Sequence, residues 1–105
     1  MKAVRIHGYG SAEVLRFEEA PLPDCGPEDV LIRVVGSSVN PVDWKLREGY
    51  LRSMLKPTMP FTLGWDVSGM VHAVGANAQR FKLGDAVYSR PDIARNGCYA
   101  EFVCA

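Results

Sequence analysis

Asp-Val-Leu-Ile-Arg-Val-Val-Gly-Ser-Ser-Val, residues 29–39, is the stretch of sequence that decides the class of fold. Val30 and Ile32 fall on one face of an extended chain, because successive side chains of a strand alternate between its two faces. The same period of two recurs at residues 2–7 and 66–76, which predicts strands there as well. Glycines in the last stretch indicate a bent strand or a close approach of two backbones, as a small barrel requires.

One segment, residues 40–49, breaks the pattern of strands and predicts a short helix. Asn40 is suited to the N-cap, the proline after it to the first helical position, and Asp43 to the first turn. Gly49 supplies a left-handed C-terminal stop. A second short helical turn is expected to follow and to end at Pro57.

Three further short strands are expected between turns rich in glycine and proline, at residues 14–18, 85–89 and 98–104. About a hundred residues, of which 48% are hydrophobic, suffice for a single core. We therefore expect one domain over residues 1–105. Its fold class is mainly β (α+β), a partly open β-barrel with one or two short helices.

Charge and hydropathy exclude several classes of function. The 12 basic and 12 acidic residues are interspersed, so no basic face is available to bind phosphates, and we expect no nucleic-acid partner. No apolar run approaches the roughly twenty residues needed to cross a bilayer, and the first residues lead into a strand pattern rather than a secretory signal. We expect a soluble, cytoplasmic protein with no membrane partner.

The three cysteines, Cys25, Cys98 and Cys104, are too few and too irregularly spaced for a disulfide scaffold or a zinc knuckle. On one extended strand Cys98 and Cys104 would lie roughly 20 Å apart, at about 3.3 Å per residue, which is too far for a disulfide. We expect all three to be reduced, buried, small hydrophobic residues, with a reactive thiol as the alternative.

Neither glycine motif in the chain makes a phosphate-binding loop. Residues 8–10 have the first two glycines of a dinucleotide fingerprint, but Glu13 stands at the position of the third glycine. Residues 64–69 have the spacing of a phosphate loop, but Met70 stands where its lysine and hydroxyl residue would begin. The sequence therefore predicts no nucleotide-phosphate site of its own.

Seven short motifs, spread over essentially the whole chain, are specific through their order and spacing. They are residues 1–4, 28–32, 38–43, 60–69, 74–75, 81–87 and 97–103. Together they resemble the amino-terminal, GroES-like catalytic domain of the medium-chain dehydrogenase/reductase superfamily, in its zinc-independent quinone oxidoreductase-like branch. The resemblance implies that the predicted barrel is GroES-like.

Two positions within these motifs indicate the branch. Asn40 stands where the zinc alcohol dehydrogenases have a cysteine ligand, and Trp65 stands where they have a histidine after the glycine. A site with neither a thiolate nor an imidazole cannot hold zinc tetrahedrally. The resemblance therefore implies no metal, NADPH as cofactor, and reduction of a small-molecule substrate, a quinone or an α,β-unsaturated carbonyl.

The resemblance also implies a cleft beside the predicted helix. Asn40 either only caps this helix or also lines the nicotinamide and substrate cleft. Lys45 is either a solvated surface residue or a functional one, which donates a proton or hydrogen bond to a developing enolate or contacts the cofactor. It is the only catalytic candidate. Asp43 is expected to stabilise the first turn rather than to act as an acid. The substrate-pocket candidates are Trp44, Tyr50, Trp65 and Asp66. Core packing is favoured for Trp44, with the pocket wall as the alternative, and Tyr50 either stacks on the substrate or covers the core. A pocket role is favoured for Trp65, and a structural hydrogen-bonding role for Asp66.

In this superfamily a Rossmann domain binds the cofactor, and residues 1–105 contain no glycine-rich βαβ unit. We therefore expect that the chain is a segment of a longer enzyme and is inactive alone. Its partners would be the Rossmann domain of the same chain and a second copy that binds through that domain. The alternative is a stand-alone GroES-like interaction or scaffold module that assembles as a ring.

Overall fold

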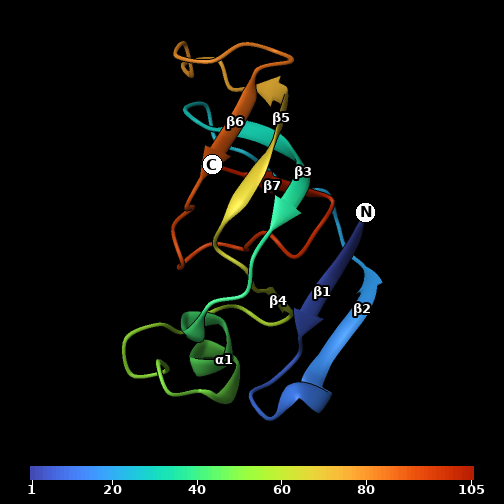
Figure 1. Ribbon diagram of the computed structural model, residues 1–105. Helices are drawn as coiled ribbons and strands as arrows, with labels where there is room; N and C mark the ends of the chain where they lie inside the picture. The colour runs from blue at the N-terminus through green and yellow to red at the C-terminus, as the bar shows by residue number, and fades with distance from the viewer.

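The computed structural model describes residues 1–105, and their strands form two antiparallel sheets with one α-helix at the end of the molecule (Figure 1). The first sheet has the order β2 (Leu15–Glu19), β1 (Lys2–Ile6), β4 (Phe61–Thr62). The second has the order β6 (Ala86–Ser89), β5 (Val67–Val74), β3 (Val30–Ser37), β7 (Phe102–Cys104). A bridge between Ala3 and Ala100 joins the sheets without closing them. The predicted mainly β, partly open barrel is confirmed.

The central pair of strands, β3 and β5, is bent as the glycines predicted. Its register shifts between Leu31 and Ile32 and again between Val34 and Gly36. A methyl group added at Gly69 would collide with the carbonyl oxygen of Arg33, so the two backbones approach closely there. Only glycine permits this approach. The two bent strands stay paired from Val30 to Ser37 of β3.

The helix α1 (Pro41–Glu48) begins and ends where the sequence predicted. Asn40 is its N-cap within a capping box, and Gly49 ends it in the left-handed conformation at φ 90°. The second helical turn is absent as a helix. Residues 50–55 instead form successive turns, in which Leu51 accepts from the N–H groups of Met54 at 2.9 Å and Leu55 at 2.8 Å. No helix of this chain has the length and apolarity required to cross a bilayer.

Three details of the first sheet and of the last strand differ from the prediction. A 3-10 turn, η1 (Ala12–Val14), precedes β2, and the two-residue strand β4 was not foreseen. The last strand is shorter than residues 98–104, because the N–H groups of Cys98 and Tyr99 donate to the carbonyls of Gly64 at 2.7 Å and Leu63 at 2.9 Å. These residues therefore cross the chain near Gly64 instead of extending β7.

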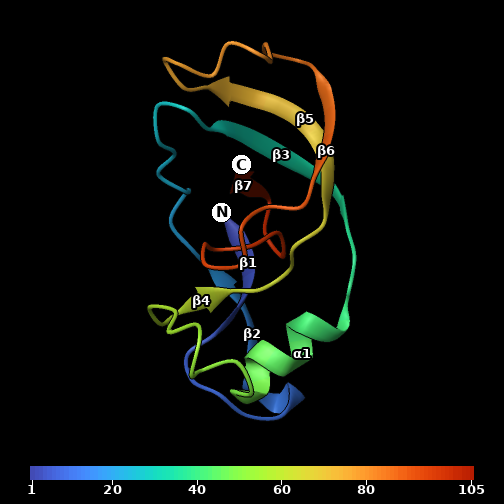
Figure 2. The same ribbon diagram turned by 90° about the vertical axis from the view of Figure 1, so that its left-hand side faces the viewer.

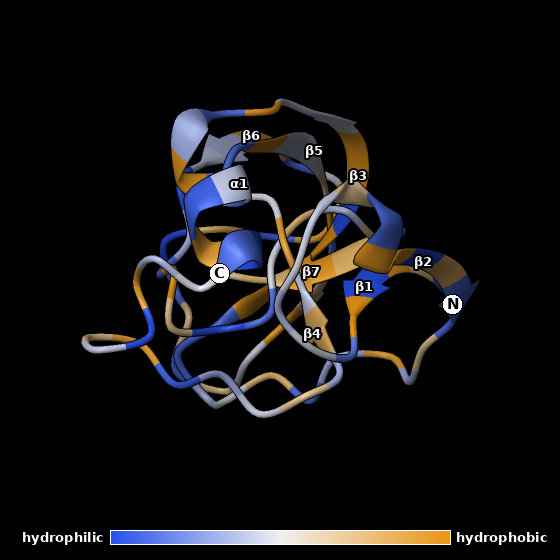
Figure 3. Ribbon diagram, turned by 90° about the horizontal axis from the view of Figure 1, so that it is seen from below, coloured by the Kyte–Doolittle hydropathy of each residue, from blue (hydrophilic) through white to orange (hydrophobic).

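Two hydrophobic clusters fill the interior. The sheet-side cluster lies under β3 and β5 and consists of Val30, Ile32, Val67, Val71, Cys98 and Val103. The helix-side cluster lies between α1 and the first sheet and consists of Ile6, Leu46, Phe61, Leu63 and Trp65. Figure 2 shows β3 and β5 at one end of the molecule and α1 at the other. Figure 3 shows the hydropathy of each residue, with hydrophilic and hydrophobic bands following one another along β1 and β2.

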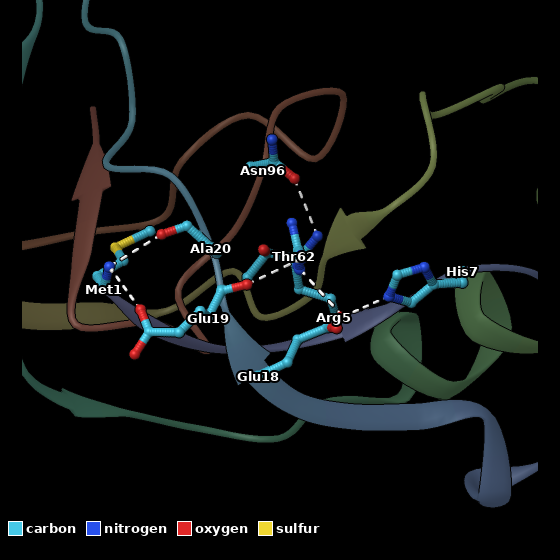
Figure 4. Close-up of polar contacts among 8 residues, drawn as sticks. All are labelled: Met1, Arg5, His7, Glu18, Glu19, Ala20, Thr62 and Asn96. Atoms are coloured by element: carbon cyan, nitrogen blue, oxygen red, sulfur yellow. Dashed lines mark hydrogen bonds and ion pairs between the residues drawn. The ribbon is translucent and has the colours of Figure 1, made fainter.

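Polar contacts fasten the ends of β1 to β2 (Figure 4). Arg5 Nε donates to Glu18 at 3.2 Å, and His7 Nε2 contacts the same carboxylate. At the other end the amino group of Met1 donates to the carbonyl oxygen of Ala20 at 2.9 Å. These contacts hold Ala20 in place, where the chain leaves the first sheet.

The prediction that all three cysteines are reduced is wrong for two of them. Cys25 and Cys104 form a disulfide with a Cα–Cα distance of 5.5 Å, which joins the segment before β3 to β7. Sequence spacing could not reveal this pair, because 79 residues separate its members. Cys98 is free and buried, as predicted. Burial, together with the nearby carboxylates of Asp66 and Asp43, raises the pKa of Cys98 to about 12, so this thiol stays protonated and unreactive.

Candidate active site

The N-terminus of α1 meets the segment between β4 and β5 at a site built around two aspartates. Asn40 and Asp43 come from the start of the helix, and Gly64, Trp65 and Asp66 come from the segment. Hydrogen bonds join the two groups at Asp43 and at Asp66. The structure therefore brings together Asn40 and Asp66, two of the residues that the sequence singled out.

Asp43 is the buried member of the pair of aspartates, with an exposed fraction of 3%. One carboxylate oxygen accepts from the backbone N–H of Asn40 at 2.7 Å, and the other accepts from that of Gly64 at 3.0 Å. The positive end of the helix dipole also stabilises a negative charge at this position. Asp43 is thus the first-turn stabiliser that the sequence predicted, and in addition it fixes Gly64 to the helix.

Asp66 is half-buried and holds side chains rather than backbone groups. Its carboxylate accepts from the Ser38 hydroxyl and from the Asn40 side-chain amide, each at 2.6 Å. The hydrogen bond from Ser38, then that from Asn40 and the charge of Arg90, keep the pKa of Asp66 below its ordinary value. Asp66 is therefore ionised and fixes the orientation of the Asn40 amide.

A shallow, open groove with a volume of about 360 Å³ runs beside Asp66. It is lined by Gly36, Ser37, Ser38, Asp66, Val67, Ser68, Tyr88 and Ser89. Hydroxyl groups and an ionised carboxylate can bind the amide, hydroxyl or carbonyl groups of a small molecule.

Gly64 and Gly97 mark the point where two backbones cross in direct contact. Gly64 has a φ of 95°, and a methyl group added to it would collide with the ring of Tyr99. A methyl group added at Gly97 would collide with the carbonyl oxygen of Gly64. The geometry of the site is therefore set by direct contact between backbones.

Sequence reasoning assigned no role to Ser38 and Tyr99, which belong to the site. The Tyr99 hydroxyl donates to the Ser38 carbonyl oxygen at 3.3 Å. Burial and the negative charge of Asp43 raise the pKa of Tyr99 above its usual value, so its hydroxyl keeps its proton. Both residues lie inside motifs that carried the resemblance, and this was the sign in the sequence that they could belong to a site. A motif does not show which of its side chains contact one another.

Lys45, Trp44 and Tyr50 lie on the exposed side of α1 and the turn after it. Lys45 Nζ is 5.8 Å from the centroid of the Trp44 ring, and the rings of Trp44 and Tyr50 meet edge to face at 5.7 Å. No hydrogen bond or ion pair joins these three side chains to Asn40 or Asp66. They form an aromatic and cationic patch of their own, and their roles in the pocket remain predictions.

Trp65 is a core residue in this structure. Its exposed fraction is 1%, and its ring stacks on Phe61 with the centroids 6.0 Å apart. Its indole N–H is buried without a hydrogen-bond partner. The sequence favoured a pocket role for Trp65, but this burial leaves the indole no surface with which to contact a substrate.

The donor set at the site does not suit a zinc ion. Asn40, Ser38 and Asp66 offer an amide, a hydroxyl and one carboxylate, and the Cys98 thiol is protonated. Structural and catalytic zinc sites take mostly thiolates and imidazoles. The single group of three potential metal ligands in the chain, Cys25, Asp29 and Cys104, has its two sulfurs joined in the disulfide.

Comparisons with known proteins agree with this geometry. A family model described as the alcohol dehydrogenase GroES-like domain matches residues 26–105. Quinone oxidoreductase from Homo sapiens is 42% identical over 109 residues, which cover 100% of this chain and 31% of the relative. This chain therefore spans about a third of the length of the curated relatives that it matches.

Solved structures show the same fold. The quinone oxidoreductase from Coxiella burnetii superposes with a TM-score of 0.88 at 34% identity, over 100% of this chain and 34% of that one. A mycobacterial protein, Rv1454c, solved in complex with NADPH, superposes with a TM-score of 0.83 at 34% identity, over 100% of this chain and 31% of that one.

Proposed function

Because this chain belongs to the alcohol dehydrogenase GroES-like domain family, as a quinone oxidoreductase-like member of the medium-chain dehydrogenase/reductase superfamily, we propose that it is the substrate-side domain of an NADPH-dependent, zinc-independent oxidoreductase. The proposed substrates are quinones or α,β-unsaturated carbonyls. The GroES-like character expected from the motifs is confirmed by the superposition on the Coxiella burnetii enzyme.

The observation that carries the proposal is the pairing of Asn40 with Asp66 beside the groove. The Asn40 amide nitrogen donates to Asp66 at 2.6 Å and to the Ser38 hydroxyl at 3.3 Å, so its orientation is fixed from two sides. Of these three side chains, Asn40 stands where, by resemblance, zinc-dependent relatives keep a cysteine ligand, and here it bonds to Asp66 and Ser38 instead. This arrangement supports a reaction in which the protein positions the reactants and no metal polarises the substrate.

NADPH supplies the hydride when it is bound. The hydroxyl groups that line the groove and the Asn40 amide bonded to Asp66 are of the kind that can hydrogen-bond the carboxamide end of such a cofactor, and Asn40 and Lys45 are the proposed contacts. Because the chain has no phosphate cradle, a Rossmann domain in a longer chain would bind the rest of the cofactor. Trp44 and Tyr50 are proposed for the wall of the substrate pocket, and Lys45 for donating a proton or hydrogen bond to the oxygen that becomes an enolate.

A chimeric enzyme tests this division of labour. In the chimera the chain replaces the corresponding third of the Coxiella burnetii quinone oxidoreductase. We expect no binding of NADPH at micromolar concentrations by the isolated chain in calorimetry. We expect the chimera to oxidise NADPH with 1,4-benzoquinone or an enone, in buffer that contains EDTA. A folded chimera that binds NADPH but reduces neither substrate, or whose activity needs zinc, would contradict the proposal.

A pair of lysine variants of the chimera tests the proposed donor. Lys45→Ala should lower kcat about a hundredfold if Lys45 donates the proton in the rate-limiting step. The matched control is Lys56→Ala, which removes an exposed lysine beyond the helix and should leave kcat unchanged. Equal activity of the two variants would remove Lys45 from the mechanism and leave the rest of the proposal standing.

A further inference from the structure

The Cys25–Cys104 disulfide holds a segment that has no other anchor. Before this segment, the Ala20 N–H donates to the Met1 carbonyl oxygen at 2.8 Å. After it, the Asp29 N–H donates to the Gly26 carbonyl oxygen at 3.2 Å. Residues 21–25, which include two prolines, make no hydrogen bond between these points. The disulfide is therefore the tie that keeps this segment against β7.

The disulfide is within reach of a small reductant. Cys25 is half-buried and Cys104 is buried, but a polar cavity of about 320 Å³ reaches Cys104. The cavity is lined by Pro23, Asp24, Thr58, Phe61, Ala94, Arg95, Asn96 and Cys104. Thiol–disulfide exchange requires access of a thiolate to one of the sulfurs, which the half-buried Cys25 and this cavity allow.

A continuous set of contacts leads from the disulfide towards the candidate active site. The Asp29 carboxylate binds both terminal nitrogens of Arg95, at 2.6 and 3.1 Å. The residues after Arg95 cross the chain near β4, since Asn96 accepts from the Thr62 N–H at 2.9 Å, as Figure 4 shows, and the Cys98 N–H donates to Gly64 at 2.7 Å.

We propose that the Cys25–Cys104 disulfide is a reducible clamp whose state is transmitted through the Asp29–Arg95 ion pair to the backbone around Gly64. A dithiol reductant supplies the two electrons and two protons. Its thiolate attacks one sulfur of the disulfide, and its second thiol then closes the reductant's own disulfide and leaves Cys25 and Cys104 as thiols. Residues 21–25 are then free to leave β7. The backbone of Asp29 stays anchored, but one of its carboxylate oxygens lies within 4.8 Å of both sulfurs, so separation of the sulfurs shifts this carboxylate and its ion pair with Arg95. The proposal is independent of the reaction that the site performs.

Labelling of the folded chain tests the clamp itself. In chain purified without reductant, N-ethylmaleimide should modify no cysteine, and after dithiothreitol it should modify Cys25 and Cys104 but not the buried Cys98, as read by peptide mass spectrometry. Every sample contains EDTA, because the ligand atoms of Cys25, Asp29 and Cys104 lie within 4.8 Å of one another and could bind a metal once reduced. Immediate labelling of Cys25 without dithiothreitol would overturn the proposal.

Hydrogen exchange followed by NMR tests the transmission. On reduction, we expect exchange at the amides of Gly97 and Cys98 to become at least about tenfold faster, since their partners near Gly64 would no longer be held. In Arg95→Ala this response should disappear, and in the matched control Arg80→Ala, which removes an exposed arginine, it should persist. Equal exchange in the oxidised and reduced wild-type chains, or a response unchanged by Arg95→Ala, would overturn the proposal.

Discussion

The regions around Asp43 and Asp66 hold two carboxylates of the same type in opposite ways. Asp43 is buried, and its partners are the backbone N–H groups of Asn40 and Gly64. Asp66 is half-buried, and its partners are the side chains of Ser38 and Asn40. Backbone donors are present in any sequence with this fold, whereas side-chain donors can change one at a time. The first region therefore stabilises the fold, and the second can be adapted to a particular chemistry.

The largest expected effect comes from removing the buried carboxylate. Asp43→Ala leaves the buried Gly64 N–H and the partly buried Asn40 N–H without acceptors, and we expect it to lower the free energy of unfolding by about 3 to 5 kcal/mol. Urea unfolding followed by circular dichroism measures this loss. Asp66→Ala is the matched comparison and should cost clearly less, because water can replace its partners. Equal losses in the two variants would contradict the contrast between the regions.

The next effect tests the joint between the two regions, at Gly64. Gly64→Ala combines a left-handed backbone with a collision against the Tyr99 ring, and should lower the free energy of unfolding by about 2 to 4 kcal/mol. Gly84→Ala is the control, because Gly84 has a φ of 85° and no atom within 4 Å of an added methyl group. This control should cost only about 1 to 2 kcal/mol in the same urea titration. A Gly64→Ala variant no less stable than the control would show that the Tyr99 ring moves aside freely.

A smaller effect is expected at the residue that the two regions share. Asn40→Ala removes the N-cap side chain of α1 and one donor to Asp66, and should lower the free energy of unfolding by about 1 kcal/mol. Asn77→Ala, at an exposed position outside the helices and strands, should stay within about 0.5 kcal/mol of the wild type. A loss as large as that of Asp43→Ala would mean that the Asn40 side chain belongs to the fold-stabilising region.

The smallest effect is the pH dependence of Asp66. Because its pKa in the folded protein is below its unfolded value, Asp66 contributes stability above the unfolded pKa of about 4, and this contribution is lost as pH falls through the folded pKa. A titration of the side-chain carboxyl carbon by NMR should show this low value. Ser38→Ala should raise the pKa towards its ordinary value, and an unchanged pKa in that variant would show that the Ser38 hydroxyl does not lower it.

The parts of the fold that depend on local pattern were predictable from the sequence. The alternation in residues 29–39 and the capping signals of residues 40–49 act between neighbours along the chain, and β3 and α1 follow them. The strand β4 has only two residues, too few to show a period. The Cys25–Cys104 pair depends on how the chain folds back, which no spacing rule contains.

The candidate site was predictable to the level of segments but not of side chains. Motifs located Asn40 and Asp66, which the structure brings together. Adjacent residues in an extended segment face opposite ways, so Trp65 and Asp66 do not face the same side. The motifs did not show that Trp65 is the one that turns into the helix-side cluster. They also gave no sign that Ser38 would be a partner of Asp66.

The crossing of Gly64 and Gly97 has a consequence for how this domain can vary. No side chain separates the two strands of backbone at that point, so the spacing between them does not depend on the size of any residue. Positions that line the groove, such as Ser38 and Tyr88, can then be exchanged for larger or smaller groups without changing this spacing. Redesign of the ligand preference of this domain should begin with those rim positions and leave the two glycines untouched.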